Sequence, residues 1–200
     1  MLVEKGNKKI IWFRNNLRTH DAAFWSHIQE TDHVIAVYCM EPEWLQPTPY
    51  GWRKMEAFRA KFLLETLADL QQQLLENNIS LYIFQANTVD AFKQIHAVFP
   101  FDTIITQAEW TQEEAKIEQK LKSTFPAITW KVDYDQFLIE PSNLPFLINQ
   151  LPDVFTSYRK KVEQKWAVKN VMPKPNLLFK KMDIPFSSSI PTLEELGYPS

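Results

Sequence analysis

Residues 10–21 read IIWFRNNLRTHD, an apolar run that passes directly into a polar loop carrying two arginines. This run, taken as residues 9–14, predicts a buried strand of a parallel sheet, because strands covered on both faces are apolar throughout instead of alternating. Further runs of the same kind, bounded by polar turn residues, follow at residues 33–40, 80–84, 102–106 and 127–132.

The intervals between these runs have helical patterns. In residues 54–76 apolar side chains recur every three or four positions, which predicts a long helix with the apolar face Phe58, Phe62, Leu63, Leu67, Leu70 and Leu74. Shorter helices are predicted over residues 21–28, with Asp21 as the cap, over 87–98, with Asn87 or Thr88 as the cap, and over 111–122, with a capping box at residues 111–114. The alternation predicts a Rossmann-like α/β domain over residues 1–134, with a doubly wound five-stranded parallel sheet in the order 3-2-1-4-5.

The remaining residues, 135–200, lack this alternation and are rich in proline. They predict an extended segment that packs partly on the α/β domain, with one short helix over residues 156–165. A stretch of this length without regular structure is usually a linker or a functional arm.

Composition excludes several classes of protein. The net charge of −2 argues against a polybasic nucleic-acid binder, and the single cysteine, Cys39, excludes an intramolecular disulfide and indicates a reducing, cytoplasmic compartment. The sequence has no apolar run long enough to span a membrane and no signal-peptide pattern at its start. Three glycines cannot build a glycine-rich phosphate cradle, and the histidines lack the paired spacing of a metal site, so neither a metal site nor a catalytic residue is assigned.

The loop after the first strand supplies the first candidate binding residues. Arg14 and Asn15 follow the carboxyl end of that strand, where open α/β sheets bind their ligands, and suit contacts with an anion or a cofactor. The alternative is that Arg14 or Arg18 pairs with Asp21 or with a neighbouring carboxylate. Arg59, predicted to be half-buried in the long helix, needs a partner, and a structural ion pair is the alternative to a ligand contact.

The loop after the fourth strand supplies the second group of candidates, Gln107 and Glu109. A carboxylate at the carboxyl end of a strand can accept hydrogen bonds from a ring N–H or an amino group of a ligand. The alternative for Glu109 is a solvated loop acid. The adjacent Trp110 offers either a stacking surface or a cap on the core.

These segments resemble the cryptochrome/photolyase family. Residues 11–21 look like its opening signature, residues 58–70 like its second helix, and residues 107–114 like the loop after its fourth strand. Residues 151–163 and 190–197 are most similar to the DASH branch.

The resemblance implies the N-terminal domain of a light-driven DNA-repair or blue-light-sensing flavoprotein. In the family this domain carries an antenna chromophore, often a folate such as methenyl-tetrahydrofolate, and precedes a helical FAD-binding domain that repairs pyrimidine dimers. Glu109 aligns with a glutamate that accepts hydrogen bonds from the pterin ring, with Gln107, Arg14 and Asn15 completing the pocket wall. Arg59 is kept as a further cofactor-binding candidate.

The resemblance also implies what this chain lacks. It ends where the FAD-binding helical domain would begin, so we expect the chain alone to bind no FAD, to repair no dimers and to meet DNA only through that domain. Residues 135–200 would be the interdomain linker, and Phe137, Phe146, Phe155 and Trp166 would lose their partner, which favours self-association.

The sequence departs from the family pattern at two places, and a second function stays open. Asn16 stands where an aspartate is usual, which removes a charge partner of Arg18, and residues 76–78 lack the usual glycine, although asparagine tolerates the left-handed conformation. The alternative function is a stand-alone interaction or regulatory α/β domain that binds no chromophore. A generic nucleotide-binding domain is disfavoured by the missing glycine-rich motif.

Overall fold

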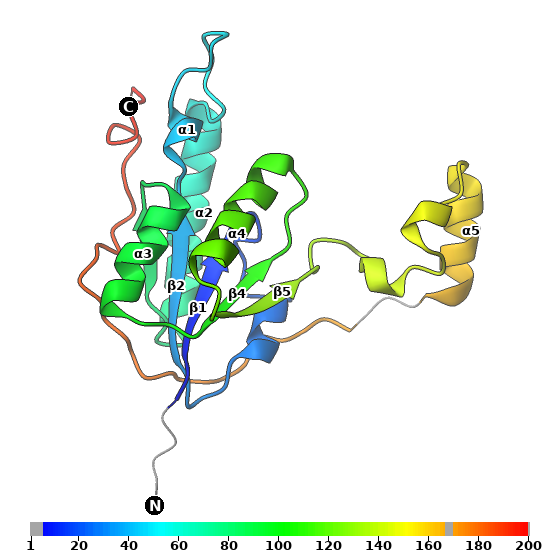
Figure 1. Cartoon of the computed structure of the whole chain (residues 1–200), viewed down its shortest axis with the longest axis horizontal. Coiled ribbons are helices and arrows are strands. Elements are labelled where there is room, and N and C mark those ends of the chain that lie inside the picture. The colour runs from blue at the N-terminus through cyan, green and yellow to red at the C-terminus, as the bar shows by residue number, and fades with distance from the viewer. Residues whose placement is uncertain (1–5, 167–169, 200) are drawn as a thin grey trace, which may run out of the picture.

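The structure, a computed structural model, describes residues 6–166 and 170–199 (Figure 1). Its centre is a parallel sheet whose strands lie in the order β3-β2-β1-β4-β5, so the predicted fold and strand order are confirmed. The strands are β1 (Lys8–Phe13), β2 (His33–Cys39), β3 (Leu81–Phe84), β4 (Thr103–Gln107) and β5 (Thr129–Asp133). The register places Ile11 of β1 between Ala36 of β2 and Ile105 of β4, and all three are buried.

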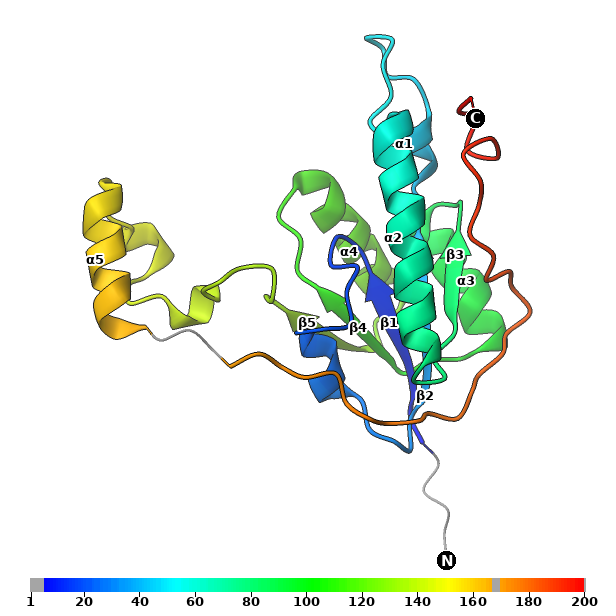
Figure 2. The same cartoon turned by 180° about the vertical axis from the view of Figure 1, so that it is seen from behind.

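Helices cover both faces of the sheet (Figures 1 and 2). One face packs against α2 (Ala57–Leu75) and the 3-10 helix η1 (Ala23–His27), and the other against α3 (Thr88–Val98) and α4 (Gln112–Thr124). A short helix that the sequence did not predict, α1 (Pro42–Leu45), follows β2. Successive side chains of β1 alternate between the two cores, because neighbouring residues of a strand point to opposite faces.

The predicted helix caps are right for two helices and wrong for one. Asn87 caps α3 by accepting a hydrogen bond from the Val89 N–H at 3.1 Å, and Thr111 forms the capping box of α4. Asp21 does not cap η1, which begins after Ala22. Its carboxylate instead accepts a hydrogen bond from the Met172 N–H at 2.9 Å, so the residue fastens the C-terminal segment and not the helix.

The apolar face predicted for α2 is only partly the buried one. Phe58 and Phe62 are 92% and 70% exposed, whereas the buried residues of the helix are Ala60, Leu64, Leu67, Leu70 and Leu74. At 3.6 residues per turn, the two phenylalanines lie on the side of the helix opposite this buried stripe. The helix therefore has an apolar surface on two sides near its start.

The C-terminal segment crosses the α/β domain as an extended strap, which we define as residues 170–199 (Figure 2). Phe179, Leu196 and Tyr198 are buried in the core on the α2 side, and Met182, Ile184 and Phe186 pack against the core on the α3 side. Asn77, 3% exposed, holds the strap by donating hydrogen bonds to the carbonyls of Pro175 at 3.1 Å and Leu177 at 2.7 Å.

The intervening residues leave the body of the domain. After β5 come two 3-10 turns, η2 (Pro141–Asn143) and η3 (Ile148–Gln150), and then α5 (Phe155–Lys165), which matches the predicted short helix and stands apart from the sheet (Figure 1). Phe155 and Phe137 are 71% and 47% exposed, whereas Phe146 and Trp166 are partly buried.

Candidate functional site

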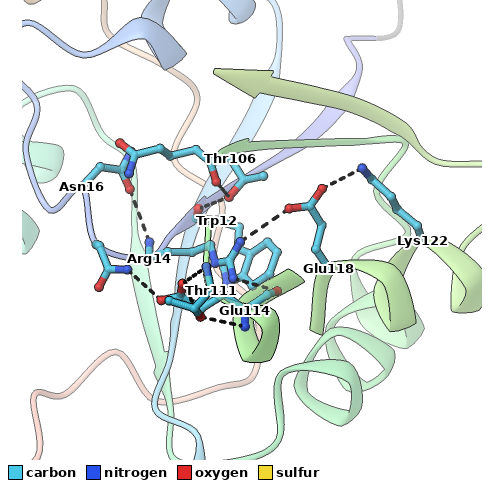
Figure 3. A network of polar contacts seen from close by, with 10 residues as sticks. Trp12, Arg14, Asn16, Thr106, Thr111, Glu114, Glu118 and Lys122 are labelled. Atoms are coloured by element: carbon cyan, nitrogen blue, oxygen red, sulfur yellow. Dashed lines mark hydrogen bonds and ion pairs between the residues drawn. The ribbon is translucent and has the colours of Figure 1, made fainter. Parts of the chain in front are cut away.

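Arg14 directly follows β1 and packs against α4 near the carboxyl ends of β1 and β4 (Figure 3). The strand order reverses between these two strands, and open α/β sheets bind ligands at such a point. The guanidinium of Arg14 lies over the Trp12 ring at 4.5 Å, and its Nη2 donates a hydrogen bond to the Glu114 carbonyl at 3.0 Å. Nη1 lies 3.5 Å from Oε2 of Glu118.

A cavity of about 30 Å³ lies between the ends of β1 and β2 and the N-terminal ends of α3 and α4, lined in part by Trp12, Arg14, Glu41, Thr88 and Glu114. Such a volume holds about one water molecule and no nucleotide. Burial lowers the pKa of Arg14, while the charges of Glu109, Glu114, Glu118 and Glu41 act in the opposite direction.

The loop after β1 is fastened to the start of α4 and to the residues beyond β5. The Asn15 side-chain amide donates a hydrogen bond to Oε1 of Glu114 at 3.1 Å, and the Thr111 hydroxyl bonds the other oxygen of that carboxylate at 2.8 Å. Arg18 bonds the Asp21 carbonyl and lies 3.3 Å from the Asp135 carboxylate. Asn16 is neutral and cannot form an ion pair with Arg18, so Asp135 provides the negative charge beside that arginine.

Two acceptor side chains at the end of β4 have an oxygen without a hydrogen-bond donor. Gln107 is 3% exposed, and its side-chain Oε1 is buried and receives no hydrogen bond from any described residue. Oε1 of Glu109 is buried in the same way and equally lacks a donor within the described part of the chain. Burial raises the pKa of Glu109, an effect that the Asn15 side chain opposes, and the nearby charges of Glu114 and Arg14 raise and lower it respectively.

The structure thus brings together Arg14, Asn15 and Glu109, three of the five predicted site residues, and leaves Arg59 apart. Arg14 and Asn15 both contact Glu114, and both lower the pKa of Glu109, while Gln107 ends β4 two residues before Glu109. Arg59 is exposed instead of half-buried, and its Nη1 donates a hydrogen bond to the Lys54 carbonyl at 3.2 Å. The predicted burial was wrong because Arg59 lies on the flank of α2, at the edge of its buried stripe, where the guanidinium reaches solvent.

Glu41 belongs to the site but was not predicted from the sequence. It follows β2, is 6% exposed, and accepts hydrogen bonds from the Thr88 N–H at 3.0 Å and from the Asn87 amide at 3.4 Å. Its carboxylate therefore sits at the positive N-terminal end of α3, where a phosphate group would otherwise bind. An acidic residue directly after a buried strand is the sequence signal that points to this position.

Among residues 6–166 and 170–199, no three histidine, cysteine or acidic side chains form a group that could hold a metal ion. No helix within those residues is long and apolar enough to cross a membrane. Cys39 is buried, and burial raises the pKa of its thiol to about 12.

Comparisons with known proteins agree on one family. Residues 9–176 match the sequence model described as DNA photolyase. The chain is 30% identical over 194 residues to cryptochrome DASH of Gloeobacter violaceus, with 96% of this chain and 39% of that protein covered. It is 32% identical over 197 residues to cryptochrome DASH of Danio rerio, with 94% of this chain and 37% of that protein covered.

A solved structure gives the same result. The cryptochrome of Synechocystis sp. PCC6803 superposes on 98% of this chain with a TM-score of 0.82 and 29% identity, over 41% of its own length. The chain therefore spans about two fifths of the length of its relatives. The matched sequence model and the names of these relatives show that this chain belongs to the cryptochrome/photolyase family, in its DASH branch.

Proposed function

We propose that this chain is the antenna-chromophore domain of a photolyase or DASH cryptochrome, the N-terminal part of a light-driven DNA-repair or blue-light-sensing protein. The observation that carries the proposal is the pair of buried acceptor oxygens on Gln107 and Glu109, at the carboxyl end of β4, in a chain of this family. Buried acceptors of this kind are costly unless a donor meets them, and a bound ligand with N–H groups supplies it.

The proposed ligand is a folate, methenyl-tetrahydrofolate. Its pterin ring presents adjacent N–H donors, and an ionised carboxylate such as Glu109 presents only acceptors. Gln107 would accept a further bond, and Arg14 and Asn15 would hold the wall beside Glu109 through their contacts with Glu114. Arg59 has no place in this arrangement, since its described contact is with the Lys54 carbonyl.

The chain alone is proposed to bind no FAD and to repair no dimers. The relatives are about two and a half times as long, so the flavin and the contact with DNA are assigned to a helical domain outside residues 1–200. That domain, on the same polypeptide or on a separate chain, is the proposed partner. The cytoplasmic location stays a prediction, since the related Arabidopsis thaliana protein is named cryptochrome DASH, chloroplastic/mitochondrial.

One observation favours the alternative, a stand-alone interaction domain without a chromophore. Tyr50, Trp52, Phe58 and Phe62 are 82%, 55%, 92% and 70% exposed, and they lie in or after the turn between α1 and α2. Clustered exposed aromatic side chains are typical of surfaces that bind another protein.

Titration of methenyl-tetrahydrofolate, followed by its near-UV absorbance, separates the two functions. We expect the wild type to bind weakly, and Glu109→Gln to bind at least about tenfold more weakly, because a hydrogen bond to a charged group contributes roughly 1.5–3 kcal/mol. Glu43→Gln, a neutralised exposed acid on α1, is the matched control and should bind as the wild type does. Equal affinity of Glu109→Gln would show that Glu109 does not contact the folate, and no binding by the wild type would favour the interaction domain.

A further inference from the structure

One short loop of the α/β domain holds both ends of an excursion of the chain. Between β5 and the strap, the chain leaves the body of the domain and forms an arm, which we define as residues 138–166 and which includes α5 (Figures 1 and 2). The chain departs beside Asp135 and returns at Met172 of the strap, and both residues bond the loop formed by residues 18–23. Two points far apart in the sequence therefore share one anchor.

At the first end, Asp135 is bonded through its backbone and through its side chain. Its carbonyl accepts a hydrogen bond from Nη2 of Arg18 at 3.0 Å. Oδ2 of its carboxylate accepts a hydrogen bond from the Ala23 N–H at 2.9 Å and lies 3.3 Å from the same Arg18 nitrogen. Next to this end, the ring of Phe137 contacts the ring of Trp110 at 5.4 Å, and Trp110 is 54% exposed, so it does not cap the core. The first end is therefore held by polar bonds and by one exposed ring contact.

Asp21 joins the second end of the excursion to the first. Its N–H donates a hydrogen bond to the Met172 carbonyl at 3.1 Å, and Oδ1 of its carboxylate accepts one from the Met172 N–H at 2.9 Å. Its carbonyl accepts hydrogen bonds from Nε and Nη2 of Arg18 at 3.2 Å and 2.8 Å, and the same Nη2 bonds Asp135. One residue therefore connects both ends, directly to Met172 and through Arg18 to Asp135.

The backbone of Asp21 has a left-handed conformation, with a φ of +50°. For a residue with a Cβ atom this conformation is less stable than the right-handed one, although aspartate and asparagine adopt it more readily than most residues. It persists where the surrounding structure fixes it. At Asp21 the bonds that fix it are those to Arg18 and Met172, the same bonds that hold the two ends of the excursion.

The arm itself adds nothing to the two cores of the domain. Within the part of the chain that the structure describes, no apolar residue of 138–166 belongs to either core or packs against one. Its helix α5 packs instead on the arm, since the ring of Tyr158 lies 5.4 Å from the ring of Phe146. Four of its apolar side chains are 60–73% exposed: Leu138, Leu147, Val154 and Phe155. The arm is therefore a separate unit that is fastened to the domain at its ends.

We propose that Asp21 is the positioning residue of a latch, formed by Arg18, Asp21, Asp135 and Met172, which sets the orientation of the arm and whose opening frees the arm while the sheet and the strap stay folded. The strap keeps its place because the Asn77 side chain and the buried Phe179 hold it independently of the latch. Opening breaks polar bonds and the contact of Phe137 with Trp110 but uncovers no core, so the arm can change its orientation on a folded domain. This inference does not rest on the proposed chromophore.

The test measures distances between two spin labels in the 200-residue chain by pulsed electron paramagnetic resonance. The arm pair, Gln94→Cys with Gln164→Cys, joins exposed positions on α3 and α5. The body pair, Glu65→Cys with Gln94→Cys, joins exposed positions on α2 and α3 and reports whether the domain stays folded. Cys39 stays unlabelled because it is buried. Both pairs are measured with the native Asp21, with Asp21→Ala and with Asp21→Asn.

We expect a narrow distance distribution for the arm pair with native Asp21 and with Asp21→Asn. An asparagine oxygen still accepts the Met172 N–H, and asparagine tolerates the left-handed conformation. Asp21→Ala should widen the distribution of the arm pair by about twofold or more, because a segment that is no longer held samples more orientations, and should leave the body pair unchanged. An unchanged width in Asp21→Ala, or a wide distribution already with native Asp21, would overturn the proposal.

Arg18→Met provides a second way to open the latch, since it removes the bonds to the Asp21 carbonyl and to Asp135 but keeps the Asp21 side chain. It should widen the distribution of the arm pair as Asp21→Ala does. Glu43→Ala, at an exposed acid on α1, is the matched control and should change neither pair. If Asp21→Ala and Arg18→Met both widen the distribution of the body pair as well, residues 18–23 are needed for the fold itself and the proposed latch is excluded.

Discussion

The surroundings of Glu109 disfavour the ionised form of its carboxyl group. Burial raises the pKa of its carboxyl above the ordinary value of 4.5, and Glu114 adds to this effect, while Asn15 and Arg14 only partly oppose it. When the pKa of an acid is higher in the folded protein than in the unfolded protein, its ionised form destabilises the fold. The cost is absent below the ordinary pKa, grows as the pH rises toward the raised pKa, and is complete above it.

Glu109→Gln should therefore stabilise the fold at pH 7 and leave its stability unchanged near pH 4. The measurement is the midpoint of urea unfolding at both pH values, with Glu43→Gln as the control that shows no gain at either. A loss of stability at pH 7 would mean that the ionised carboxylate makes favourable contacts that outweigh its burial. A gain in stability together with a loss of folate affinity would identify Glu109 as a residue kept for binding at the expense of stability.

For single residues of the site, the position in the fold could be predicted from the sequence, whereas the side-chain contacts could not. Arg14, Asn15, Gln107 and Glu109 follow strands whose carboxyl ends share one edge of the sheet, so the strand order alone brings them close together. The sequence does not say that Arg14 folds back over Trp12, since that depends on the Glu114 carbonyl in α4. Glu41 was missed because its partner, the Thr88 N–H, lies 47 residues along the chain.

In the long helix α2, the spacing of apolar residues does not by itself identify the buried face. Two stripes of apolar residues share its first half: Phe58 and Phe62 are four residues apart, and so are Leu63 and Leu67, so four-residue spacing alone does not tell the exposed pair from the buried stripe. Only packing against the sheet selects the stripe that contains Ala60 and Leu64, whose buried neighbours then include Leu67. The other stripe, Phe58 and Phe62, stays exposed.

We expect the double variant Phe58→Ser, Phe62→Ser to unfold at nearly the wild-type denaturant concentration, because both side chains are mostly exposed. Its self-association, measured by analytical ultracentrifugation, should fall below that of the wild type. Leu67→Ala, at a fully buried position of the same helix, should cost about 2–5 kcal/mol of unfolding free energy. A double variant as unstable as Leu67→Ala would show that the phenylalanines belong to the core.

In the molecule as a whole, the strap contributes residues to the core that its sequence pattern does not predict. Proline and polar residues dominate residues 170–199, and periodicity finds no element there, yet Phe179 is 2% exposed and Tyr198 is 6% exposed. The predicted extended segment is present, but its packing comes from contacts with Asn77 and Met55 more than 90 residues away. Contacts of that range leave no local signal in a sequence.

Phe179 and Leu178 provide a matched test of the strap, since these adjacent residues are 2% and 63% exposed. Phe179→Ala should lower the free energy of unfolding by about 3–5 kcal/mol, and Leu178→Ala should leave it nearly unchanged. Guanidinium unfolding followed by tryptophan fluorescence gives both values. Similar values for the two variants would mean that the strap lies loosely on the domain and does not complete its core.

The burial of Tyr198 also sets the timing of folding during synthesis. Tyr198 and Leu196 pack beside residues that precede them by well over 100 positions, among them Met55. The ribosome therefore has to add roughly 65 residues after β5, which takes about 3–13 s at typical rates of elongation, before the core can close. Until the strap leaves the exit tunnel, the apolar residues that Phe179, Leu196 and Tyr198 later cover remain exposed on the nascent domain.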